Sequence, residues 1–243
     1  MVSALLIHLK KSCVADVSSN VFMYFLVFMS RHTYIAFEWL DGSGKDTQKD
    51  HAIQYIQKKN KYAFIRQIRE PSVYTDAGKK IKGILSNHTT ETVTPLELLK
   101  LFVEDRVELS PLIKEILNHS HVISSRCFLS SYAYQQTQWI EFDTIDNLHS
   151  KATIRYPDHI IYFDLSVEEA ERRIINRLRK TWWKRELFET KEFQQCNRKI
   201  YTETIDRLKT KHTIHIIDGS DSIEEVFLKT ERIIDEIMNR DEV

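Results

Sequence analysis

The chain has 243 residues, enough to bury the core of one full domain. Its hydrophobic content of 42% and charged content of 29% are ordinary for a soluble globular protein. Lys plus Arg equals Asp plus Glu at 35 each, and this balance argues against a large surface for the phosphate backbone of DNA or RNA. We therefore expect no nucleic-acid partner.

The cysteines are few and far apart, and none forms a CxxC pair: Cys13, Cys127 and Cys196. This spacing offers neither a zinc site nor a disulfide framework, and it suits a reducing compartment. We therefore predict a cytoplasmic protein.

The N-terminal segment contains nine consecutive apolar residues, Val21 to Met29. A bilayer-spanning helix needs about 20 such residues. A signal peptide is also a poor match, because Lys10 and Lys11 lie far upstream and no small-residue cleavage site follows cleanly. We expect residues 1–31 to be an extension outside the domain, residues 32–243 to form the domain, and no membrane partner.

From Tyr34 onward, short apolar runs alternate with longer helical patterns. This alternation is typical of βαβ units, and apolar strands of this length are typical of a parallel sheet buried on both faces. The predicted strands are Tyr34–Phe37, Ala63–Ile68, His121–Ser124, Ile160–Leu165 and Thr213–Ile217. The sequence predicts one three-layer α/β domain with a five-stranded parallel sheet flanked by helices.

The first predicted strand leads into a glycine-rich turn with Gly42, Gly44 and Lys45. Backbone N–H groups of such a turn and of the following helix start bind phosphates, and the lysine reaches the outer phosphates. The alternative is a plain strand-to-helix turn with an exposed lysine. The P-loop pattern G-x-x-x-x-G-K-[ST] would place Gly at position 39 and Ser or Thr at 46, where this chain has Trp39 and Asp46. A carboxylate at position 46 repels phosphates unless a cation intervenes.

Three later helices are predicted to start with capping boxes, in which a hydroxyl and a glutamate three residues later satisfy each other's backbone N–H groups. The pairs are Thr94 with Glu97, Ser166 with Glu169, and Ser222 with Glu225. Pro95 occupies the first helical position after Thr94.

The segment from Phe37 to Gln48 resembles FEGxDGxGKTTQ, the opening of the thymidylate kinases, which are P-loop nucleoside-monophosphate kinases. The resemblance implies the P-loop NTPase fold with a short lid. It also implies that Lys45 is catalytic and that Asp41 accepts a hydrogen bond from the sugar 3′-hydroxyl of the acceptor. The implied ATP-binding residues are Asp41, Gly42, Ser43, Gly44, Lys45, Asp46 and Thr47.

Two further elements resemble this family in order along the chain. Arg69-Glu70-Pro71 resembles its REP element, which implies that Arg69 holds the phosphate of the nucleoside monophosphate. Leu101 to Arg106 resembles its LFxADR helix, which implies that Phe102 stacks on thymine and that Arg106 reaches the base. Taken alone, an arginine ending a strand is usually a surface residue, and an aromatic in a helical stripe is usually core.

Val122 to Gln135 resembles the family's VISDRYxxSSxAYQ element. The match implies that Arg126 contacts the transferring phosphates. It also implies that the base is read, and a ribose 2′-hydroxyl excluded, by Ser131, Tyr134 and Gln135. The chain departs from the pattern at Ser125, where the family has an acidic residue, and at Cys127.

Pro157 to Leu165 resembles the family's PDLxxYLD strand, and seven basic residues follow between Arg172 and Arg185. Such a segment can also be a solvated helix face or an RNA-binding patch. As a lid, its arginines would stabilise charge on the transferring phosphoryl oxygens. We expect Arg185 to be the catalytic lid residue, with Arg177 second.

The resemblance implies a Mg²⁺-dependent kinase that converts ATP and dTMP to ADP and dTDP and that forms a homodimer. One alternative is a kinase for another deoxynucleotide or nucleoside. The other is a non-catalytic nucleotide-binding relative, suggested by Trp39, Asp46 and Ser125.

Two of these departures suggest an exchanged metal site. In the family pattern the loop supplies a hydroxyl and the end of the third strand a carboxylate; here the loop has Asp46 and the strand end Ser125. Mg²⁺ accepts both kinds of oxygen ligand. The alternative is that Asp46 caps the helix that starts there and Thr47 takes the metal.

Overall fold

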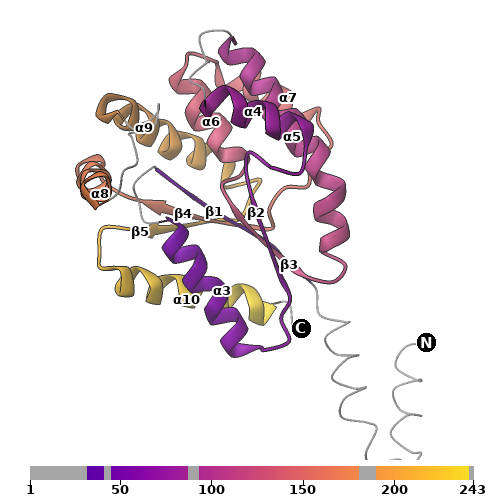
Figure 1. Cartoon of the computed structure of the whole chain (residues 1–243), viewed down its shortest axis with the longest axis vertical. Coiled ribbons are helices and arrows are strands. Elements are labelled where there is room, and N and C mark those ends of the chain that lie inside the picture. Colours follow the sequence, from indigo (N-terminus) through magenta and orange to yellow (C-terminus); the bar gives the residue numbers. More distant parts are fainter. Residues whose placement is uncertain (1–31, 41–44, 87–92, 181–189, 241–243) are drawn as a thin grey trace, which may run out of the picture. The chain divides into compact units, whose positions relative to one another are not determined.

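Five strands form one parallel sheet in the order β2–β3–β1–β4–β5 (Figure 1). The structure is a computed structural model that describes residues 32–40, 45–86, 93–180 and 190–240. The strands are β1 Tyr34–Trp39, β2 Ile65–Arg69, β3 His121–Ser125, β4 His159–Asp164 and β5 Ile214–Asp218. All five predicted strands and their parallel pairing are therefore confirmed, with ends that differ by one or two residues. The predicted extension, residues 1–31, lies outside the described residues, so the domain division stays a prediction.

Helices cover both faces of the sheet, which gives the predicted three layers. The helices are α3 Lys45–Lys59, α4 Asp76–Ser86, α5 Pro95–Ile116, α6 Phe128–Thr137, α7 Phe142–Ser150, α8 Val167–Lys180, α9 Lys191–Leu208 and α10 Ile223–Arg240. In Figure 1, α3 and α10 lie together on one side of the sheet, and α5, α6 and α9 lie on the other.

Strand β1 shows why the sheet is buried on both faces. All six of its residues are buried, and successive side chains of a strand point to opposite faces. Tyr34 and Ala36 join the core formed with α5, α6 and α9. Ile35, Phe37 and Trp39 join the core formed with α3 and α10. Trp39 is thus a residue of the strand and of the core.

Two of the three predicted capping boxes are complete. At α5, the Glu97 N–H donates to Thr94 Oγ1 (3.2 Å) and the Thr94 N–H to Glu97 Oε2 (2.8 Å). Ser222 and Glu225 make the same pair of bonds at α10.

The box predicted at α8 is only half formed. The Glu169 N–H donates to Ser166 Oγ, but the Glu169 carboxylate accepts from Arg172 and Arg173 instead. Two guanidinium groups on the next turn compete for this carboxylate, which is the physical reason that the prediction was wrong there.

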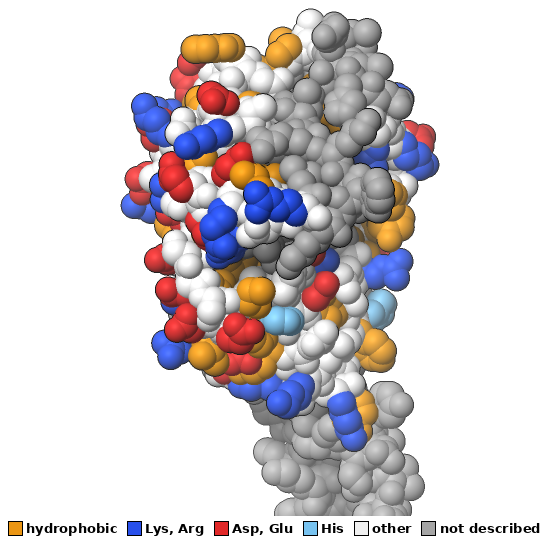
Figure 2. Space-filling model, turned by 60° about the vertical axis from the view of Figure 1, so that its left-hand side comes forward, with side chains coloured by type: hydrophobic (Ala, Val, Ile, Leu, Met, Phe, Trp, Pro, Cys, Tyr) orange, Lys and Arg blue, Asp and Glu red, His pale blue; other side chains and the backbone are white. Residues whose placement is uncertain are grey.

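Within the described ranges, no helix is both long and apolar enough to cross a membrane. On the face shown in Figure 2, the described Lys and Arg side chains are interspersed with Asp and Glu, as the equal totals of the two charges imply.

The turn between β2 and α4 depends on a glycine. A Cβ added at Gly78 would overlap the carbonyl oxygen of Ser72 and would lie 2.6 Å from Thr75 Oγ1 and 2.7 Å from Asp105 Oδ1. The Asp105 carboxylate in turn accepts from the Ser72 N–H (2.9 Å) and from the Thr75 hydroxyl. Gly78 therefore allows α4 to approach the turn that follows Arg69.

We predict that Gly78→Ala lowers the free energy of unfolding by about 1–3 kcal/mol, because a backbone carbonyl must move. Gly83, on the same helix, has no atom within 4 Å of an added Cβ, and Gly83→Ala should raise the free energy of unfolding by about 0.5–1 kcal/mol. Urea unfolding of both variants measures the contrast. Equal effects of the two substitutions would contradict this account of the turn.

Candidate active site

Three neighbouring strands end in register at one edge of the sheet. Ser125, the last residue of β3, is paired with Phe37 of β1 on one side and with Arg69 of β2 on the other. Backbone bonds continue past the strand ends, from the Arg126 N–H to Phe37 O (2.8 Å) and from the Glu70 N–H to Ser125 O (3.0 Å). Ligands of parallel α/β sheets bind at this carboxyl edge.

The predicted phosphate loop lies between β1 and α3, the strand–turn–helix order that such a loop requires. Its residues Asp41, Gly42, Ser43 and Gly44 and the side chain of Lys45 lie outside the described part of the chain. The same holds for Arg185 and for the side chain of Arg177. Their predicted roles stay predictions.

Asp46 and Thr47 are exposed in the first turn of α3. Helix α3 begins at Lys45, so Asp46 is its second residue rather than the residue before it. The Ser125 hydroxyl, at the end of β3, lies 3.5 Å from Asp46 Oδ1. The structure therefore brings the two predicted metal ligands together.

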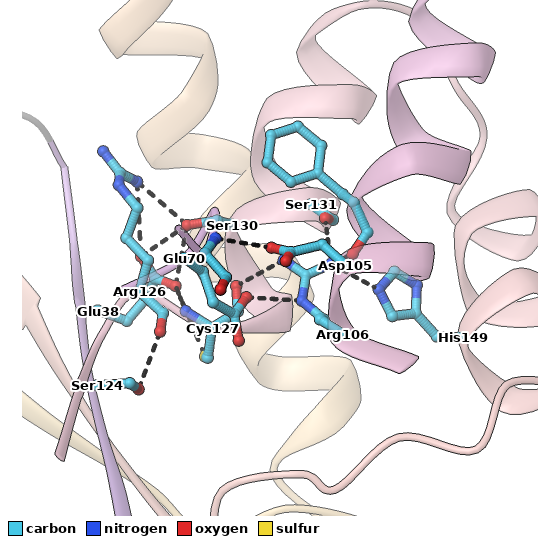
Figure 3. A network of polar contacts seen from close by, with 12 residues as sticks. Glu38, Glu70, Asp105, Arg106, Ser124, Arg126, Cys127, Ser130, Ser131 and His149 are labelled. Atoms are coloured by element: carbon cyan, nitrogen blue, oxygen red, sulfur yellow. Dashed lines mark hydrogen bonds and ion pairs between the residues drawn. The ribbon is translucent and has the colours of Figure 1, made fainter. Parts of the chain in front are cut away.

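Arg126 follows β3 with a backbone φ of 68°, in the left-handed region that non-glycine residues rarely adopt. Its guanidinium donates to Ser130 Oγ (3.1 Å) and to the Tyr134 hydroxyl (2.9 Å), and it lies 5.0 Å from the centre of the Tyr134 ring. The Glu38 carboxylate lies 3.7 Å away. Figure 3 shows Arg126, Ser130 and Glu38 together with the neighbouring network around Arg106.

Arg69 ends β2 with an exposed side chain, and Lys82 of α4 lies close to it. Burial lowers the pKa of Lys82, and the positive charge of Arg69 lowers it further. Two positive charges held near one another form a site that an anion would stabilise. Among the described residues, neither side chain has a hydrogen-bond or ion-pair partner, so both side chains are available to a phosphate group.

Arg106 of α5 is buried and bound by protein groups on several sides. Its guanidinium donates to Glu70 Oε2 (2.7 Å), to Ser131 Oγ (2.8 Å) and to the carbonyl oxygen of Cys127 (3.2 Å). The Phe102 ring, one turn earlier on α5, lies 5.8 Å from it. Burial raises the pKa of Glu70 to about 7, so taking this ion pair out of water is costly even with Arg106 beside it.

The remaining predicted base-reading residue, Gln135, is 1% exposed, and its Oε1 atom has no hydrogen-bond partner in the described part of the chain. Buried polar atoms in folded proteins nearly always have a partner, so this oxygen is suited to accept from a ligand. Its neighbours on α6, Ser131 and Tyr134, are already bound by Arg106 and Arg126.

Some polar residues near this edge had no predicted role. Glu38 stands in the quoted motif, and Lys82 is one of several lysines on α4; neither has a sequence signal that separates it from its neighbours. Tyr201 donates to Glu38 across 163 residues of sequence, a contact that only the fold reveals. Gln194 and Asn197, one turn apart on α9, are buried and carry side-chain atoms that have no hydrogen-bond partner among the described residues.

His149 of α7 completes the surroundings of Arg106. Its Nε2 lies 3.3 Å from the Arg106 guanidinium and its Nδ1 2.9 Å from the Ile145 carbonyl oxygen. These partners suit a neutral ring with the proton on Nδ1. Burial, together with the positive charge of Arg106, lowers the pKa of His149 to about 3.

We predict that His149 makes the protein less stable as the pH falls. Between about pH 6.5 and pH 3, the unfolded chain binds a proton at this imidazole and the folded chain does not, so the free energy of unfolding decreases with decreasing pH. The expected loss is about 2 kcal/mol between pH 8 and pH 5. Urea unfolding of His149→Gln at both pH values should lack this part of the loss.

Replacing the exposed His119 by Gln is the control for losing a histidine at the surface. The explanation would be wrong if the starting protein and His149→Gln lost the same free energy of unfolding between the two pH values.

Comparison with known proteins agrees with this arrangement. The thymidylate kinase family model matches residues 37–229. A probable thymidylate kinase of Methanococcus maripaludis is 36% identical over 213 residues, which cover 85% of this chain and 93% of that protein. Thymidylate kinase of Thermosipho africanus is 33% identical over 210 residues, which cover 83% of this chain and 97% of that protein.

The fold also matches a solved structure. Thymidylate kinase from Candida albicans superposes with a TM-score of 0.69 at 27% identity, over 88% of this chain and 95% of the other. The family model spans more than half of this chain, and relatives more than 30% identical to it are matched over almost their entire length. The chain therefore belongs to the thymidylate kinase family.

Proposed function

We propose that this protein transfers the γ-phosphoryl group of ATP to dTMP, giving ADP and dTDP. The observation that carries the proposal is the register of β1, β3 and β2. It brings the start of the phosphate loop, Arg126 and Arg69 to one edge of the sheet, as transfer between two phosphates requires.

Phosphoryl transfer needs positioning and neutralisation of charge more than covalent work by the protein. In our proposal Lys45, Arg126 and Arg185 of the lid neutralise charge on the transferring group. Arg69 holds the acceptor phosphate, and the nearby Lys82 adds a second positive charge there. Asp41 accepts from the sugar 3′-hydroxyl.

In our proposal the thymine ring lies against Phe102, and Gln135 recognises the ring through a hydrogen bond. Thymine carries one N–H donor, at N3, and the unpaired Gln135 Oε1 is an acceptor of the right kind. Ser131 and Tyr134 are proposed to line the same pocket. Because Arg106 is 3% exposed and bonded to Glu70 and Ser131, its contribution in our proposal is to fix the pocket as well as to approach the base.

Asp46 and Ser125 are the residues we propose to hold Mg²⁺. A carboxylate and a hydroxyl 3.5 Å apart form an oxygen donor set that fits this ion, which takes its other ligands from water and nucleotide phosphates. When bound, the ion would reduce the repulsion between Asp46 and the phosphates. In the described part of the chain, no group of three or more His, Cys, Asp or Glu residues forms a metal cluster.

The homodimer implied by the resemblance also remains a proposal. Leu96 and Val107 are 41% and 37% exposed on α5, and eleven residues, or three helical turns, separate them. They lie on the same face of α5, and in our proposal a second copy of the chain covers them.

The direct test is a coupled assay of the purified protein with ATP, Mg²⁺ and a panel of nucleotides. We predict turnover with dTMP and a loss of at least about 100-fold in Lys45→Ala, because a positioned charge at the phosphates is removed. Lys58→Ala, at the exposed far end of α3, is the matched control and should keep its activity. Binding of dTMP without turnover would instead support a non-catalytic relative, and turnover of a different nucleotide would overturn the choice of substrate.

The exchanged metal site makes a separate prediction. Asp46→Thr and Ser125→Asp should each lower turnover by roughly 10-fold or more, the usual scale for disturbing a metal site. The double variant should recover activity, because it restores one carboxylate and one hydroxyl. The exchange would be ruled out by an Asp46→Thr protein as active as the starting protein.

A further inference from the structure

Glu38, the fifth residue of β1, has a carboxylate with no exposed surface. Its oxygens accept from the Cys127 N–H (3.0 Å), the Ser130 hydroxyl (2.9 Å) and the Tyr201 hydroxyl (3.0 Å). These donors come from the start of α6, from α6 itself and from α9. Glu38 therefore joins β1 to α6 and to α9, and its contacts with Cys127 and Ser130 are shown in Figure 3.

A buried carboxylate is tolerated only where donors and an opposite charge compensate it. Here the three donors fix the direction of the carboxylate, and the Arg126 guanidinium lies 3.7 Å away. Because both oxygens are occupied and unexposed, Glu38 cannot reach a substrate. Any effect that it has on the reaction must pass through another side chain.

Ser130 provides the link to Arg126. Its hydroxyl has a single proton, which it gives to Glu38, and its lone pairs then accept from the Arg126 guanidinium at 3.1 Å. The carboxylate thus determines which way the serine hydroxyl points. A hydroxyl free to rotate would lose this orientation.

The rest of Arg126 is also held. Its N–H donates to Phe37 O (2.8 Å), its carbonyl oxygen accepts from Ser124 Oγ (3.0 Å), and its other guanidinium nitrogen donates to Tyr134. A non-glycine residue with φ of 68° keeps this conformation only where its surroundings impose it. Backbone and guanidinium are therefore both set before a nucleotide arrives, and such preorganisation lets a charge stabilise a transition state.

We propose that Glu38 is a positioning residue for phosphoryl transfer, which acts through Ser130 to orient the guanidinium of Arg126 toward the phosphates. The proposal rests on the proposed function, because it takes Arg126 to neutralise the transferring group. Tyr201 has a supporting role, since its hydroxyl bond secures the same carboxylate from α9.

Two variants test the proposal. Glu38→Gln keeps the shape of the side chain but removes its charge, and Ser130→Ala removes the hydroxyl that connects Glu38 to Arg126. In both we expect kcat to fall by about 10- to 100-fold, the effect of misplacing a reacting group slightly, while the KM values for ATP and dTMP change much less. Tyr201→Phe should have a smaller effect of the same kind.

Tyr55→Phe is the matched control. The Tyr55 hydroxyl also donates to a carboxylate, Asp235 Oδ2 at 2.9 Å, but it joins α3 to α10 on the other face of the sheet. The Tyr55→Phe variant should leave kcat unchanged. An equal fall of kcat in Tyr55→Phe would mean that losing any such bond disturbs the enzyme, and this would overturn the positioning role.

A double-mutant cycle with Arg126→Ala tests the path of the effect. If Glu38 acts through Arg126, adding Glu38→Gln to Arg126→Ala should cost little further kcat. Additive losses would overturn the positioning role and leave the role of Arg126 intact. Unchanged kcat in Arg126→Ala would overturn both.

Nuclear magnetic resonance of the arginine side chains gives a readout that needs no turnover. A guanidinium held by Ser130 and Tyr134 should show restricted rotation, with its signals identified by their loss in Arg126→Ala. These signals should broaden or merge in Glu38→Gln and Ser130→Ala but not in Tyr55→Phe. Unchanged signals in both network variants would overturn the proposal even if the protein had no kinase activity.

Discussion

The pairing of β3 with β1 on one side and β2 on the other is the constraint on which the rest of the site depends. In parallel strands all carboxyl ends meet at one edge, and the register decides which residues leave the sheet side by side. Here Phe37, Ser125 and Arg69 share one level of the sheet. A shift of one residue in β3 would turn Ser125 away from Asp46 and would separate Arg126 and Cys127 from their backbone and carboxylate partners on β1.

Two buried acid–arginine sets stand behind this edge. One joins Glu70 to Arg106 beneath the pocket proposed for the base, and the other joins Glu38 to Arg126 beneath the proposed path of the phosphoryl group. Buried ion pairs add little net stability, because desolvation offsets most of the attraction, but removing one partner is strongly destabilising. Their value here is geometric, since each fixes a guanidinium in one orientation.

The sequence predicted the parts of the fold that depend on local pattern. Strand β1 was recognised because Tyr34–Phe37 is continuously apolar, and α5 because Thr94, Pro95 and Glu97 form a start signal from neighbouring residues. Contacts between polar groups that are far apart in the sequence leave no such local pattern in the sequence. The capping-box pattern at Ser166 and Glu169 did not indicate that the Glu169 carboxylate would accept from Arg172 and Arg173 instead.

The same limit applies within the site. Motif spacing singled out Arg126, Ser131 and Gln135, which lie directly after β3 and on α6, and the structure gives Arg126 and Ser131 polar partners at the carboxyl edge. It did not indicate that Tyr201 would reach Glu38 from α9, or that Lys82 would lie beside Arg69, because these contacts arise from packing between elements. Sequence reasoning thus found the residues proposed to face the nucleotide better than the residues that hold them.

The departures from the family pattern look different once each side chain is located. Trp39 replaces a small loop residue in the pattern, but it ends β1 in register with Phe163 and is buried in the core with α3 and α10. A large apolar side chain is stabilising there, because it adds buried area on the face away from α5, α6 and α9. Asp46 and Ser125 differ from the pattern together and lie within 3.5 Å of each other. One departure is therefore part of the core. The other two place one carboxylate and one hydroxyl side by side where α3 begins, which is the geometry that the proposed exchange of metal ligands requires.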